Sequence, residues 1–172
     1  MRNLAATPFV FPDETMLEIN PVDRLENPVL RSASEYWHQL RGRRRFPSRE
    51  ELNPGGFSVA LRHMAMVRVI DGGADYEYRI VGDTLACEFS IPLNSRTVSD
   101  IAVNAPATAA LLRRVYKHAV QSGEPFAVCG TTGRNAETAM FTHLEAVVLP
   151  MGADESTVDH LLTFMVCESN AK

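Results

Sequence analysis

The stretch from Met64 to Val81 constrains the fold more than any other part of the chain. Met64–Ile70 and Asp75–Val81 each place apolar side chains on one face in alternation, which is typical of half-buried β-strands. Asp71-Gly72-Gly73 lies between them, and glycine supplies the positive φ angles that tight hairpin turns need. The sequence therefore predicts an antiparallel hairpin that the rest of the chain covers and extends.

Three further strands are predicted near the C-terminus. They are Pro125–Thr131, Thr138–Leu149, which we expect Pro150 to end, and Val158–Cys167; the first two are joined by a turn at Gly133-Arg134-Asn135. The last strand is apolar on both faces, and such a strand needs cover on both sides. We therefore expect helices on both faces of the sheet at this strand.

Helical segments are predicted between the hairpin and these strands. Thr84–Phe89, with Asp83 as its cap, and Thr97–Ile101 are short. The best helix is Ala105–Gln121, with Asn104 as its cap and Gly123 after its last turn, since asparagine is favoured at an N-cap and glycine just past a helix.

An earlier helix, Asn27–Leu40, carries the only tryptophan of the chain. Asn27 is suited to an N-cap, Pro28 to the first helical position, and Gly42 to the end. Its apolar stripe must be buried, either in the core of the same protomer or at a dimer interface. The interface candidates are Val29, Ala33, Trp37 and Leu40.

Arginines are concentrated just after this helix. Guanidinium groups bind phosphate and carboxylate in a bidentate manner, so the cluster is a candidate anion site. The same side chains can instead pair with Glu50 and Glu51 or remain solvated. The anion-binding candidates are Arg43, Arg44, Arg45 and Arg49.

The charge and the N-terminal segment exclude several classes of protein. The net charge is −4, which argues against nucleic-acid binding, because that function needs a basic footprint. Residues 1–26 contain several prolines and predict an irregular extension, with no run long enough to cross a membrane. Cys87, Cys129 and Cys167 are few and far apart; we interpret them as buried thiols in a reducing, cytoplasmic compartment.

At this point the order of elements resembles a PAS domain over about Leu61 to Cys167. More closely, the chain is similar to a proteobacterial subfamily of small stand-alone PAS proteins. The motifs that carry the resemblance are Tyr36-Trp37-His38-Gln39-Leu40-Arg41-Gly42, Phe46-Pro47-Ser48-Arg49 with Asn53-Pro54, Tyr78-Arg79-Ile80-Val81-Gly82, and Leu144-Glu145-Ala146-Val147-Val148-Leu149-Pro150-Met151.

The resemblance implies an α+β fold: a five-stranded antiparallel sheet with helices on one face and an N-terminal helix packed outside. It divides the chain into the extension 1–26, the N-terminal helix and Arg-rich connector 27–60, and a PAS-like domain 61–168. It implies a non-catalytic sensory or regulatory protein that binds a small ligand, a signalling partner or both, commonly as a homodimer. We recognise no output domain after Cys167 and expect action through contacts.

A ligand cavity is expected between the hairpin and the helices. A fully packed core without a cavity is the alternative. The pocket candidates are Val67, Tyr78, Leu85, Phe89, Leu112, Tyr116, Leu144 and Met165.

No cofactor, metal or catalytic motif is identified. His118 is a candidate haem ligand but sits among basic residues, and Cys87 lacks the Asn and Arg neighbours of the photoactive flavin group. His143 and Glu145 share a strand face without a third ligand. The alternative function is a small-molecule enzyme with a ketosteroid-isomerase-like cone fold that uses Tyr78, Tyr116 and Asp100.

Overall fold

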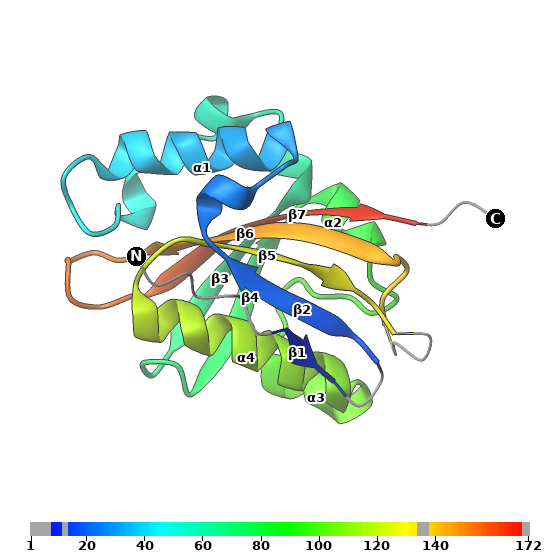
Figure 1. Cartoon of the computed structure of the whole chain (residues 1–172). Helices are drawn as coiled ribbons and strands as arrows, with labels where there is room; N and C mark the ends of the chain where they lie inside the picture. Colours follow the sequence, from blue (N-terminus) through cyan, green and yellow to red (C-terminus); the bar gives the residue numbers. More distant parts are fainter. Residues whose placement is uncertain (1–7, 12–13, 134–137, 170–172) are drawn as a thin grey trace.

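The computed structural model describes residues 8–11, 14–133 and 138–169 and contains one antiparallel sheet. Its strand order is β1-β2-β5-β6-β7-β3-β4. Helix α1 lies on one side of the sheet, and α3 and α4 lie on the other (Figure 1). The α+β class and the antiparallel sheet are as predicted, but the structure has seven strands where the resemblance implied five.

The predicted hairpin is confirmed. It consists of β3 (Met64–Ile70) and β4 (Asp75–Val81). The turn has positive φ values of 46° at Asp71, 68° at Gly72 and 111° at Gly73, which explains why two glycines occupy it. The register shifts between Met66 and Val67, where β4 has one extra residue.

The three later strands are β5 (Phe126–Thr131), β6 (His143–Met151) and β7 (His160–Glu168). Leu161 and Leu162, neighbours on opposite faces of β7, are both 0% exposed, so the predicted cover on both sides is present. Pro150 does not end β6. It pairs with Leu161 of β7 but lies beyond Val148, the last residue that pairs with β5, so its missing N–H interrupts no ladder. The predicted turn at Gly133-Arg134-Asn135 lies largely outside the described residues.

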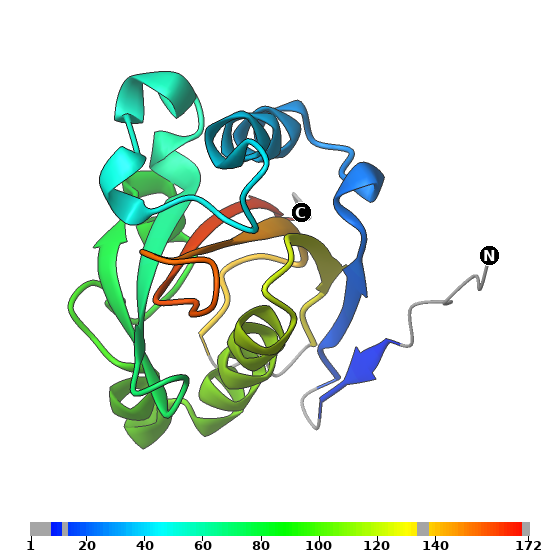
Figure 2. The same cartoon turned by 90° about the vertical axis from the view of Figure 1, so that its left-hand side faces the viewer.

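The N-terminal extension differs from the prediction because part of it is strand. β1 (Phe9–Val10) pairs with β2 (Met16–Asn20), and β2 pairs with β5 along its whole length. In Figure 2, β2 lies beside the rest of the sheet and β1 lies outside it, as the edge strand. Leu17 is buried in the core while Met16 is exposed, which is the alternation of an added strand.

Three helices cover the face of the sheet opposite α1, which we call the inner face. They are α2 (Asp83–Cys87), α3 (Val98–Asn104) and α4 (Pro106–Ser122). Gly123 ends α4 with a φ of 62°, as predicted. The predicted cap at Asn104 is wrong, because Asn104 is the last residue of α3 and Ala105 is the N-cap of α4. Gly82, not Asp83, precedes α2.

Helix α1 (Pro28–Arg41) packs on the outer face of the sheet, as predicted. The Asn27 side chain accepts a hydrogen bond from the Val29 N–H at 2.9 Å, and Gly42 ends the helix with a φ of 58°. The helix contacts β6 and β7. Short 3-10 turns complete the chain: η1 (Val22–Arg24), η2 (Arg49–Glu51), η3 (Pro54–Phe57) and η4 (Leu61–His63). Among the described residues, no helix is long and apolar enough to cross a membrane.

Candidate ligand cavity

A cavity of about 110 Å³ lies between the inner face of the sheet and the helices. β3, β4, β5, β6 and β7 contribute one wall and α2 and α4 the opposite one. Seven of the eight pocket candidates line it: Tyr78, Leu85, Phe89, Leu112, Tyr116, Leu144 and Met165. Val67 does not. It is completely buried beside the register shift in β3 and β4, where neighbouring side chains fill the space around it.

Helix α4 presents a continuous face to the cavity because its lining residues repeat at helical spacing. Thr108, Leu112 and Tyr116 follow one another at intervals of four residues, with Leu111 and Val115 beside them. Residues four apart lie on the same side of a helix. The sequence periodicity therefore identifies the wall of the cavity that α4 forms.

The N-terminal segment closes the cavity on another side, which sequence reasoning missed. Phe11, Thr15 and Leu17 line the cavity. The Arg114 guanidinium lies 3.8 Å from the centre of the Phe9 ring, and this cation–π contact joins the segment to α4. The only available signal was the short alternation in Met16–Asn20, because its partner strand β5 lies more than a hundred residues further along the chain.

The lining contains no charged side chain among the described residues. Four of its threonine hydroxyls form hydrogen bonds to other groups of the protein. The Thr132 hydroxyl donates to the Phe141 carbonyl, the Thr163 hydroxyl donates to the Ala65 carbonyl, and Thr108 and Thr138 hydrogen bond to each other. The cavity is therefore suited to an uncharged, mainly apolar occupant.

Two buried tyrosines of the lining bring their hydroxyl groups together. The hydroxyls of Tyr78 and Tyr116 are hydrogen bonded at 2.5 Å, and the two residues are 3% and 5% exposed. Burial raises the pKa of Tyr78 to about 12. Burial, with the neighbouring Tyr78 hydroxyl, raises the pKa of Tyr116 well above its usual value. Both phenols are therefore neutral at physiological pH.

The side chains considered for cofactors lie away from the cavity. His118 is exposed on α4 and packs edge-on against the Phe126 ring, with 4.8 Å between ring centres. Cys87 is exposed rather than buried, and neither residue lines the cavity. A haem or flavin ring system also exceeds a cavity of about 110 Å³, which is smaller than the roughly 150 Å³ cavity known to hold benzene. The present residues do not fit either cofactor.

No group of three or more His, Cys, Asp or Glu side chains in the described ranges is arranged to hold a metal ion. The Glu145 carboxylate instead accepts hydrogen bonds from the backbone N–H groups of Glu26 and Asn27. It therefore fixes the chain entering α1. The acid considered for an enzyme, Asp100, accepts from the Thr97 N–H in the capping box of α3 and does not line the cavity.

The four interface candidates on α1 fall into two groups. Ala33 and Trp37 are buried within the protomer, against its own sheet. Val29 and Leu40 are half-buried. The packing explains the core of the apolar stripe without a second copy of the chain, and leaves the flanks of α1 accessible.

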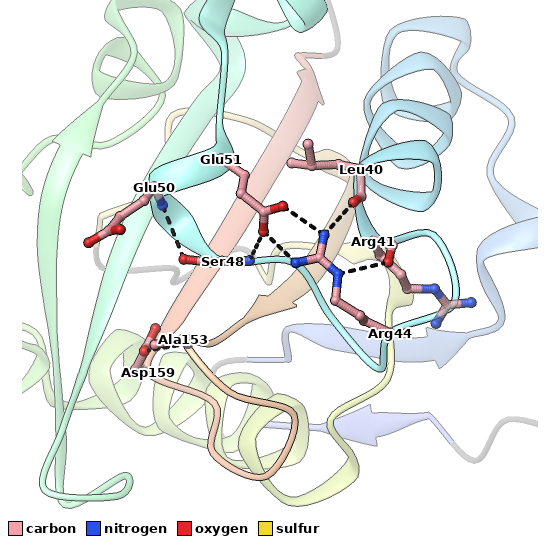
Figure 3. Close-up of polar contacts among 8 residues, drawn as sticks. All are labelled: Leu40, Arg41, Arg44, Ser48, Glu50, Glu51, Ala153 and Asp159. Atoms are coloured by element: carbon pink, nitrogen blue, oxygen red, sulfur yellow. Dashed lines mark hydrogen bonds and ion pairs between the residues drawn. The ribbon is translucent and has the colours of Figure 1, made fainter.

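The arginine cluster is only partly free to bind an anion. Arg44 makes two 2.7 Å contacts with the Glu51 carboxylate and donates to the carbonyls of Leu40 and Arg41 (Figure 3). The hydrogen bond from Arg44 lowers the pKa of Glu51. Arg45 donates to the Ser122 carbonyl at the end of α4. Arg43 and Arg49 are exposed and make no ion pair among the described residues.

A second hollow, of about 570 Å³, lies on the outer face of the sheet, lined by residues of β2, β5, β6 and β7 and by the chain before α1. Cys129, His143 and Glu145 are among its residues. The Asn20 amide donates to the Cys129 sulfur at 3.1 Å. This hollow is larger and more polar than the cavity beneath α4.

The sheet, its two helical covers and the apolar cavity define a class of single-sheet domains that enclose a small-molecule-sized space beneath their helices. A family model described as PAS domain matches residues 25–166, and the chain belongs to that family. PAS domains are in general sensory and regulatory, and generally non-catalytic. Comparisons with curated proteins and with solved structures gave no match.

Proposed function

We propose that this protein is a non-catalytic sensory module that binds a small, mainly apolar molecule in the cavity between the sheet and α4. The observation that carries the proposal is the lining itself: an apolar space of about 110 Å³ between the sheet and the helices, without a charged side chain among the described residues. An apolar molecule entering it loses contact with water at no cost in buried charge.

The polar groups of the lining favour binding over catalysis. General acid–base catalysis needs a titratable group poised near the working pH. The cavity offers threonine hydroxyls and two phenols whose pKa values lie above their usual range. Two neutral phenols without a carboxylate are poor general acids and bases at physiological pH.

We propose that ligand occupancy is transmitted through β6 and β7. Leu144, Ala146 and Met165 line the cavity on the inner face of these strands. On the outer face, the same two strands contact α1. A ligand that repacks the inner face therefore alters the surface that supports α1, where a second copy of the chain or a signalling partner would read it. The cysteines are free, which agrees with the proposed cytoplasmic location.

The test compares ligands carried by three purified forms of the protein. Ala146→Leu places a larger side chain in the cavity, and Ala110→Leu makes the same change on the exposed face of α4. Absorption spectra and mass spectrometry of denaturing extracts should find a small apolar molecule with the wild type and Ala110→Leu, but not with Ala146→Leu. The same extract from all three forms, or no such molecule from any, would contradict the proposal.

The proposed homodimer is tested separately by light scattering coupled to size-exclusion chromatography. Leu40→Glu places a charge on the accessible flank of α1, and Gln39→Glu is the matched control at an exposed neighbour. We expect a dimer for the wild type and the control and a monomer for Leu40→Glu. A monomeric wild type at high concentration would exclude a dimer through this helix.

A further inference from the structure

We infer that the Tyr78–Tyr116 hydroxyl pair is the polar anchor of the cavity, and that it selects small uncharged ligands with one oxygen acceptor, such as a ketone, an aldehyde or an ether. The inference rests on the proposed ligand-binding function and adds the chemical class of the ligand.

Each tyrosine hydroxyl carries one proton to donate, so the pair has two protons. Their mutual hydrogen bond at 2.5 Å uses one of them. Among the described residues, neither hydroxyl makes a hydrogen bond to any other group. One buried donor is therefore left over, and a buried donor without an acceptor costs free energy.

The position of the pair makes this unused hydroxyl proton available to a ligand in the cavity. Tyr78 comes from β4 and Tyr116 from α4, and both side chains line the cavity. The hydroxyl that accepts the mutual hydrogen bond has its own proton polarised by that bond, which makes it a better donor. A ligand oxygen placed beside the pair would satisfy it.

Other polar groups of the lining are less suited to this role. The hydroxyl protons of Thr132 and Thr163 are donated to backbone carbonyls. Thr108 and Thr138 form a second pair, but Thr108 is partly exposed, so this pair lies nearer to water. Both residues of the tyrosine pair are buried, so its spare donor lies away from bulk water.

The rest of the lining determines the size and polarity of the ligand apart from its oxygen acceptor. Leu112, Leu144 and Met165 border an apolar space of about 110 Å³. Because this is below the roughly 150 Å³ of a cavity that holds benzene, the ligand is no larger than a single six-membered ring. A charged ligand would meet no counter-charge there. The ligand class is thus a compact hydrocarbon body with one neutral acceptor.

The test uses cyclohexanone and methylenecyclohexane, which have nearly the same shape but differ in the oxygen. Isothermal titration should show that the wild type binds cyclohexanone about two- to twelvefold more tightly, the range expected for one added hydrogen bond. In Tyr78→Phe/Tyr116→Phe the ratio should fall to one or below, because the carbonyl oxygen would then be buried without a donor. Tyr76→Phe is the matched control, since Tyr76 packs on the Tyr116 ring but does not line the cavity; it should keep the wild-type ratio.

Equal affinities of the wild type for both probes, or an unchanged ratio in the double variant, would overturn the inference while leaving a ligand cavity in place. Failure of both probes to bind the wild type would instead remove the proposed function itself. If the double variant does not fold, infrared spectra of cyclohexanone bound to the wild type show whether its carbonyl accepts a hydrogen bond. A carbonyl frequency below that in hexane supports the anchor, and a hexane-like frequency contradicts it.

Discussion

The indole Nε1–H of Trp37 donates a hydrogen bond to the backbone carbonyl of Pro150 at 2.9 Å. This contact joins α1 to β6 over 113 residues of sequence, on the face of the sheet opposite the cavity. Because the Trp37 side chain is 0% exposed, the hydrogen bond is made without competition from water. It fixes the position of α1 on the two strands that also line the cavity.

Replacing Trp37 by phenylalanine should therefore destabilise the protein. The change removes the donor and leaves the buried Pro150 carbonyl unsatisfied, which costs about 1–3 kcal/mol. Urea unfolding followed by circular dichroism measures the free energy of unfolding without relying on tryptophan fluorescence. Gln39→Ala, at an exposed position of α1, should change it by less than about 0.5 kcal/mol. Equal unfolding midpoints for Trp37→Phe and this control would contradict the role of the contact.

The buried tyrosine pair predicts a loss of stability at alkaline pH. Burial raises the pKa of Tyr78 to about 12 in the folded protein, whereas an exposed tyrosine has a pKa of about 10. Between these pH values the unfolded chain loses a proton that the folded chain keeps, so the free energy of unfolding falls as pH rises. Below about pH 10 this contribution is fully present.

Urea unfolding at pH 9, 10 and 11 measures this decline. Tyr78→Phe should make the decline shallower, and Tyr78→Phe/Tyr116→Phe should make it shallower still, because burial raises both pKa values. A double variant whose stability falls with pH as steeply as that of the wild type would show that the pair does not titrate as described.

Gly130 should be required for the N-terminal strand to join the sheet. A Cβ atom there would overlap the Met16 carbonyl oxygen and lie 2.8 Å from the Leu17 side chain. Gly130→Ala should therefore push β2 from β5, lower the free energy of unfolding by about 1–3 kcal/mol and speed hydrogen exchange of the β2 amides. Thr131→Ala, the next residue of β5, is the control. Unchanged exchange in β2 of Gly130→Ala would refute this close approach.

The arginine cluster should divide into structural and free members. Arg44→Ala removes the Glu51 pair and two donors to the carbonyls of Leu40 and Arg41 at the end of α1, so its melting temperature should be lower than that of the wild type. Arg43→Ala should melt at the wild-type temperature, since Arg43 is exposed. Calorimetry of both variants measures the melting temperatures. A larger decrease for Arg43→Ala than for Arg44→Ala would contradict this division.

Local signals in the sequence were sufficient for the hairpin, the helix that carries Trp37 and most of the cavity wall. The Gly72-Gly73 turn and the Asn27 cap act within a few residues, so their effect can be predicted without the fold. The cavity wall was predictable because Leu112 and Tyr116 share a helical face and Leu144 alternates correctly along its strand.

The features that the sequence did not reveal depend on distant partners. β2 is a strand because Gly130 of β5 admits it, and nothing near Met16 indicates that contact. Pro150 continues β6 because β5 has already ended beside it. Cys87 has apolar neighbours in sequence but lies on an exposed turn of α2. Periodicity assigns a face to each residue, whereas its burial depends on what packs against that face.

A methyl-resolved NMR titration with benzene tests the central claim, that this protein holds a small apolar molecule between the sheet and α4, most directly. The account predicts chemical-shift changes at the methyl groups of Leu112, Leu144 and Met165, which line the cavity. Leu162 and Val147, which are fully buried but do not line the cavity, should change little. No change at the first three with saturating benzene, or larger changes at Leu162 and Val147, would contradict it.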